Sequence, residues 1–78
     1  PAHVEADRAT LAVLYAVLAE YRLTGDQAVD AVRCLRSALH GFVALEAAGG
    51  FKLPRDLDRS YERLVDALHQ AFVTWPRE

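Results

Sequence analysis

The sequence predicts an all-α fold of three helices, in which the last two helices form a four-helix bundle with a second chain. Three observations predict it. Apolar residues recur at three- and four-residue intervals in three separate segments. Glycine-containing breaks at Thr24-Gly25 and Gly49-Gly50 separate these segments. No segment shows the strict alternation of apolar and polar residues that is typical of a β-strand.

The first helix is expected over residues 3–22. Between Leu11 and Ala19 no side of this helix is polar, so we expect the stretch to be buried nearly all round. The apolar residues that recur at helical spacing are Leu11, Leu14, Tyr15, Leu18 and Tyr21.

The second helix is expected over residues 25–48. Thr24 and Gln27 have the spacing of a capping box, in which the Thr24 hydroxyl accepts from the Gln27 backbone N–H and the Gln27 side chain reaches back. Gly49-Gly50 ends the helix, because either glycine can take the left-handed conformation that closes a helix.

The third helix is expected over residues 57–73. Either Asp56 or Asp58 can cap its beginning, and Pro76 prevents much continuation at its end. The helix is amphipathic, with charged residues opposite one apolar face. That face is made of Leu57, Tyr61, Leu64, Val65, Leu68, Phe72 and Trp75.

The second helix carries two different packing faces. One face is bulky, the other is built of small residues, and only a narrow wedge of Arg33, Arg36 and His40 is plainly polar. The small residues are Ser37, Gly41, Ala44 and Ala48. Glycine within a helix costs about 1 kcal/mol relative to alanine, and a close helix crossing at Gly41 would compensate this. Three helices of one chain cannot easily cover both faces, so we expect a second copy related by a two-fold axis.

The composition also favours a partner. Hydrophobic residues make up 53% of the 78 residues, against roughly 45–50% in an average domain. A small domain has more surface per unit volume and should contain fewer of them. Disulfides are excluded because Cys34 is the only cysteine, and its apolar neighbours predict a buried, inert thiol.

The charge and hydropathy exclude several classes of partner. The formal net charge is −2 and no basic stripe is present, so this segment by itself should not bind nucleic acid. The longest apolar run, Leu11 to Ala19, is far shorter than the roughly 20 residues that a bilayer requires. No signal peptide is visible. We expect a soluble, cytoplasmic protein without membrane contact.

No residue pattern indicates catalysis or a cofactor. Gly49-Gly50 follows no strand and is therefore no phosphate loop, and Ser37 is not in a nucleophile-elbow motif. Asp66 and His69 stand three residues apart, but two ligands on a charged helix face indicate a solvated pair rather than a metal site. We expect a protein that is not an enzyme and holds neither cofactor nor metal.

One run of residues carries a family resemblance. Residues 36–51 resemble the C-terminal domain of TetR/AcrR-type transcriptional regulators, in a subgroup with a His-Gly pair inside a long helix, here His40-Gly41. Residues 53–54 and 58–65 resemble the continuation and the last helix of the same subgroup. Some members carry a tryptophan four residues before the histidine, where this sequence departs from the pattern with Arg36.

The resemblance implies a function for the domain. Residues 1–78 would be part of the effector-binding and dimerisation domain of a transcriptional regulator, expected to be a repressor. Such a regulator binds operator DNA through an N-terminal helix-turn-helix, which is not recognisable in this chain. The expected partners are a second copy, a small apolar effector, and operator DNA through the missing domain only.

Two sets of site residues follow. The expected dimer interface consists of Ser37, His40, Gly41, Ala44, Ala48, Leu57, Tyr61, Leu64, Val65, Leu68 and Phe72. The expected ligand pocket has the apolar walls Leu14, Val17, Leu18, Leu35 and Leu39, which could equally be plain core.

The alternative hypothesis is a stand-alone helical adaptor that pairs with another protein and binds no ligand. The coding region upstream of Pro1 distinguishes the two. A basic helix-turn-helix there supports the regulator, and a reading frame that begins near Pro1 supports the adaptor.

Overall fold

The computed structural model describes residues 12–77, which form three helices. The described part of the first helix covers residues 12–19, and it is followed by α2 (Gly25–Ala47) and α3 (Leu57–Val73). No strand occurs within residues 12–77, which confirms the predicted all-α class. The bundle with a second chain stays a prediction. The expected beginning of the first helix, residues 3–11, lies outside the described residues.

The first helix ends earlier than the expected residue 22. The backbone N–H groups of residues 20–22 bond to carbonyls three residues earlier, at 2.9–3.2 Å, so the chain tightens into a narrower turn. Arg22 then has a φ of 60°, a left-handed conformation that stops the helix and turns the chain toward α2.

α2 begins after Thr24 as expected, but without the predicted capping box. Thr24 is the N-cap residue with an extended backbone, and its side chain makes no capping hydrogen bond. Gly25, the first residue of the helix, has a φ of 59°. A capping box needs helical dihedral angles from the first residue onward, so this left-handed entry explains why the predicted bond is not made.

α2 ends in a Schellman motif. Gly49 has a φ of 70°, and its N–H bonds to the carbonyl of Glu46 at 3.0 Å. The N–H of Gly50 reaches back to the carbonyl of Leu45 at 2.7 Å. These two bonds satisfy carbonyls that the helix leaves unpaired, and the left-handed Gly49 turns the chain back toward α3.

α3 covers the range that the sequence predicted. Of the two candidate caps, Asp56 makes the bond: its Oδ1 accepts from the backbone N–H of Asp58 at 3.0 Å. At the other end the Thr74 hydroxyl donates to the carbonyl of Gln70 at 3.0 Å. Local side-chain bonds therefore define both ends of this helix.

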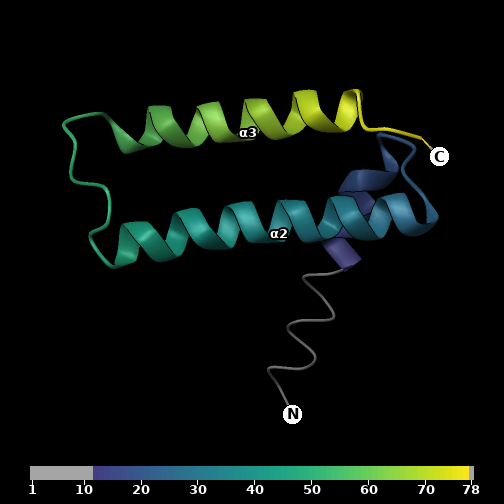
Figure 1. Ribbon diagram of the computed structural model, residues 1–78, viewed down its shortest axis with the longest axis horizontal. Coiled ribbons are helices and arrows are strands. Elements are labelled where there is room, and N and C mark those ends of the chain that lie inside the picture. The colour runs from purple at the N-terminus through teal and green to yellow at the C-terminus, as the bar shows by residue number, and fades with distance from the viewer. Residues whose placement is uncertain (1–11, 78) are drawn as a thin grey trace, which may run out of the picture.

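The core lies at one end of the helical hairpin. α2 and α3 run antiparallel, and the first helix lies against the N-terminal half of α2 (Figure 1). The connection between the first two helices reaches the C-terminal end of α3 (Figure 1). The buried side chains are Leu18, Leu23, Ala28, Ala31, Val32, Leu68 and Phe72. All of them belong to this end, where three segments meet.

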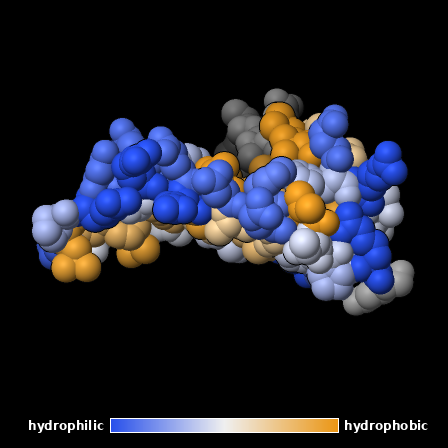
Figure 2. All heavy atoms as spheres, turned by 90° about the horizontal axis from the view of Figure 1, so that it is seen from above, coloured by the Kyte–Doolittle hydropathy of each residue, from blue (hydrophilic) through white to orange (hydrophobic). Residues whose placement is uncertain are grey.

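In the far half of the hairpin, formed by the C-terminal half of α2 and the N-terminal half of α3, no third segment within residues 12–77 covers the two helices (Figure 1). Three aromatic rings hold the two helices together there: Phe42 lies 4.8 Å from Phe51 and 5.3 Å from Tyr61 between ring centroids. Apolar atoms remain on the surface along this half (Figure 2). The large exposed hydrophobic residues of the region are Val43, Leu45, Phe51, Leu53, Tyr61 and Val65.

The expected burial of Cys34 is wrong. Its thiol is exposed. The core side of α2 is defined by Ala28, Ala31 and Val32, and residues that continue this side follow at steps of three and four. Leu35 continues this side and packs against the core, and Cys34 lies about 100° around the helix from it, outside the chain's own core.

Candidate functional site

The small face of α2 is open in the single chain. Ser37, His40, Ala44 and Ala48 are exposed, and Gly41 is half-buried. A Cβ atom built on Gly41 would meet nothing within 4 Å among the described residues. No contact within this part of the chain therefore requires a glycine at this position.

The predicted interface residues of α3 are divided between the core and the surface. Leu68 and Phe72 are 9% and 3% exposed and leave little surface for a partner. Tyr61 and Val65 are 39% and 44% exposed, and Leu57 and Leu64 are half-buried. The apolar stripe of α3 is thus wide enough for one edge to enter the core while the other stays uncovered.

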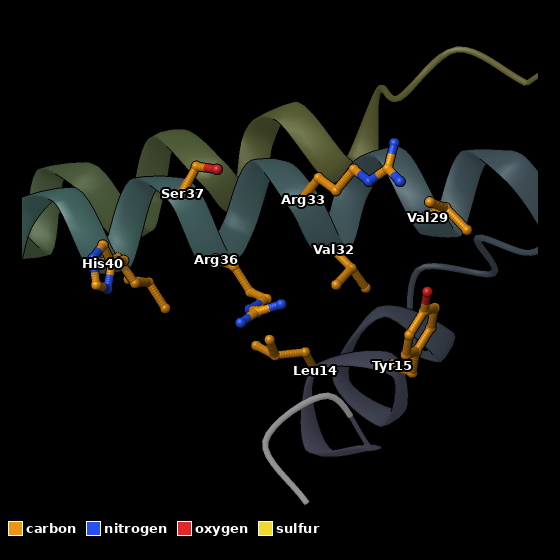
Figure 3. Close-up of a pocket in the computed structure, with 9 residues that line it drawn as sticks. Leu14, Tyr15, Val29, Val32, Arg33, Arg36, Ser37 and His40 are labelled. Atoms are coloured by element: carbon orange, nitrogen blue, oxygen red, sulfur yellow. The ribbon is translucent and has the colours of Figure 1, made fainter. Parts of the chain in front are cut away.

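A cavity of about 670 Å³ lies between the first helix and α2 (Figure 3). Leu14 and Tyr15 of the first helix form one side of it. The opposite side comes from α2 and is formed by Val29, Val32, Arg33, Arg36, Ser37, Leu39 and His40. The volume falls within the roughly 300–1,000 Å³ of small-molecule pockets.

Only part of the predicted pocket lines this cavity. Leu14 and Leu39 are among its walls. Leu18 is completely buried in the core and Leu35 packs against it. Val17 is 47% exposed and does not line the cavity.

The sequence reasoning missed the polar side of this cavity. Arg33, Arg36 and His40 were recognised only as a polar wedge on the second helix. Their spacing of three and four residues places them on one side of α2 together with Ser37. This pattern, next to Val32 and Leu39, is the signal in the sequence that could have indicated a mixed apolar and cationic site.

A second set of contacts joins the segment between the first helix and α2 to the end of α3. The Tyr21 hydroxyl lies 2.7 Å from Nδ1 of His69, and the Tyr21 ring lies 5.6 Å from that of Phe72 between centroids. The Arg77 guanidinium donates to the Tyr21 carbonyl at 2.6 Å and also to the carbonyl of Trp75. These bonds fasten the corner after the first helix onto the end of α3.

The same bonds give His69 a structural partner. His69 was expected to form a solvated pair with Asp66, whereas its ring nitrogen is bonded to Tyr21. Within residues 12–77 no group of three or more histidine, cysteine or acidic side chains is placed to hold a metal ion.

The chain matches one family model over residues 1–68, described as "Tetracyclin repressor-like, C-terminal domain". The chain belongs to this family. No curated protein and no solved structure matches it. The TetR-like C-terminal domains are not enzymes, in agreement with the prediction from the sequence. They typically bind a ligand and form dimers.

Two further observations concern the partners of this TetR-like domain. No helix within residues 12–77 is long and apolar enough to span a bilayer. The cavity borders the small face of α2, since Ser37 and His40 belong to the predicted dimer surface and also line the cavity. The two features expected of the family, a ligand site and a pairing surface, would therefore share one helix.

Proposed function

We propose that this chain is the homodimerising and effector-binding part of a TetR-type transcriptional regulator, expected to be a repressor. The observation that carries the proposal is the uncovered apolar surface on the far half of the α2–α3 hairpin of a TetR-like C-terminal domain. Operator DNA would be bound by a helix-turn-helix outside these 78 residues.

The exposure of this surface supports pairing with a second copy. Val43 and Leu45 of α2 are 60% and 51% exposed, and Leu53 in the connection is 84% exposed. Large apolar side chains in a group of this kind mark an interaction site on a small soluble domain. The α2–α3 hairpin of a second copy, packed on this far half, would cover these exposed side chains.

The open space at Gly41 supports a close approach of the partner helix. Because a Cβ at this position meets nothing in the described chain, the absent side chain leaves room for a neighbour from outside it. Ala44 and Ala48 continue the same exposed face one and two turns later. We infer that α2 crosses its symmetry mate near Gly41.

The motif around this position supports a narrower assignment within the family. We assign it to the subgroup with a His-Gly pair in the long helix, on the strength of His40-Gly41 and the run that surrounds it. His40 is exposed on the open face, where its ring can bond across the dimer.

The substitution Gly41→Leu tests the pairing surface. The first atom of the new side chain, its Cβ, meets nothing within 4 Å among the described residues, so we expect the fold to survive while the close crossing is obstructed. We expect sedimentation-velocity ultracentrifugation to show a dimer for the unsubstituted chain and monomer or aggregate for Gly41→Leu. The control is Val73→Leu, which enlarges an exposed residue at the end of α3. A dimer that persists in Gly41→Leu would refute the crossing at this face.

A further inference from the structure

The cavity between the first helix and α2 has two chemically different halves. Its apolar walls include Leu14, Val32 and Leu39, and its polar edge includes Arg33 and Arg36. The guanidinium of Arg33 points away from the gap between α2 and the first helix (Figure 3). The guanidinium of Arg36 extends into the gap between α2 and the first helix, beside Leu14 (Figure 3). A ligand in this gap would therefore contact hydrocarbon and cation at the same time.

The charge at this site has one sign. The nine lining residues include two arginines and no aspartate or glutamate. The ion pair within residues 12–77 joins Arg59 and Glu62 on α3, so neither Arg33 nor Arg36 has an acidic partner in the described part of the chain. An anion beside Arg36 would also weaken its repulsion with Arg33, three residues away on the same helix.

The shape of these donors favours a planar oxyanion. An arginine side chain presents N–H groups in a fixed fork that matches the two oxygens of a carboxylate. The lining also includes Tyr15 and His40, whose side chains can donate further hydrogen bonds. The apolar walls, in turn, can hold a hydrocarbon body that a simple inorganic anion lacks.

We propose that this cavity binds an apolar monocarboxylate, with the carboxylate at Arg36 and the hydrocarbon body against Leu14, Val32 and Leu39. The inference rests on the proposed function in that such a molecule would be the effector of the regulator. It narrows the effector from any small apolar molecule to an organic anion.

The test uses octanoate as the probe and isothermal titration calorimetry on the purified chain. We expect octanoate to bind, and octylamine, which has a similar hydrocarbon body and the opposite charge, not to bind. Arg36→Gln should weaken octanoate binding about tenfold or more, because a charge-assisted hydrogen bond is lost. Arg59→Gln, which removes an equal charge from α3, should leave it unchanged.

A second variant tests the apolar half of the site. Leu39→Ala should weaken octanoate binding by several-fold while acetate, which has almost no hydrocarbon body, remains a poor ligand of both proteins. Absence of octanoate binding would overturn the proposal. So would equal binding of octylamine, or an equal loss in Arg36→Gln and Arg59→Gln, since general charge attraction would then explain the result.

Sedimentation of the same samples separates this inference from the proposed dimer. A monomer that binds octanoate through Arg36 would refute the pairing and support the site. A dimer that binds no octanoate and dissociates in Arg36→Gln would assign Arg36 to the partner interface and refute the site.

Discussion

Single side chains decide how the corner after the first helix is held against α3. Tyr21 combines a ring contact with Phe72 and a hydroxyl contact with His69, while Arg77 bonds to its carbonyl. The three contacts join residues from opposite ends of the described chain. They close the core at the end where Leu18 is completely buried.

Tyr21→Phe removes the hydroxyl and keeps the ring. Because the bond to His69 is solvent-exposed, we expect a loss of about 0.5–1 kcal/mol in the free energy of unfolding, measured by urea denaturation. Tyr15→Phe is the matched control, because Tyr15 lines the cavity and is exposed. Equal losses in the two variants would show that the Tyr21–His69 bond contributes nothing of its own.

The sequence was least informative about the surroundings of single side chains. Arg33 and Arg36 could be recognised as polar positions of the second helix, but not as the edge of a cavity. Which element packs against a given side of α2 depends on the angle at which the first helix crosses it. The periodicity of the α2 sequence carries no information on this angle. The exposure of Cys34 was missed for a different reason, because its apolar neighbours suggested burial although position 34 lies off the core side of α2.

At the scale of the elements, local signals located most helix ends. Thr24, Gly49 and Asp56 all stand at the predicted boundaries of α2 and α3. At Gly49 and Asp56 the signals are hydrogen bonds between neighbouring residues, which a sequence can indicate directly. Thr24 marks its boundary without a side-chain capping bond. The sequence did not show which residues of the apolar face of α3 are buried in the single chain. Periodicity cannot tell that Leu68 enters the core while Val65 stays exposed.

Glycine-to-alanine substitutions should have opposite effects on stability at Gly49 and at Gly41. Gly49 has a φ of 70°, where alanine is strained, so Gly49→Ala should destabilise the chain by about 1–2 kcal/mol. Gly41 lies within α2 with free space around its Cβ, so Gly41→Ala should stabilise the single chain by up to about 1 kcal/mol. Thermal unfolding at low protein concentration, followed by circular dichroism, measures both. Destabilisation by Gly41→Ala in the monomer would contradict the open space.

At the scale of the whole molecule the described chain is unevenly covered. The first helix lies against the N-terminal half of α2, whereas the far half of the hairpin consists of α2 and α3 alone (Figure 1). Apolar side chains such as Val43 and Leu45 are therefore exposed there. The sequence indicated this condition through its excess of apolar residues, although it could not show which half of the hairpin is uncovered.

Pairing makes the stability of this molecule depend on its concentration. If the dimer forms as proposed, a hundredfold dilution should lower the stability by about 2.7 kcal/mol per dimer and the Tm by roughly 5–10 °C. Differential scanning calorimetry over this range of concentrations measures the shift. In Gly41→Leu the Tm should be independent of concentration, and a constant Tm in the unsubstituted chain would argue against self-association.

The position of Ser37 and His40, which border the cavity and also lie on the small face of α2, has a mechanical consequence. A ligand in the cavity and the partner helix would therefore contact neighbouring residues of α2. A ligand that tilts α2 at Arg36 would also change the angle at which α2 crosses the partner helix at Gly41. Ligand binding would then change the dimerisation constant, and dimerisation would change the affinity for the ligand by the same factor.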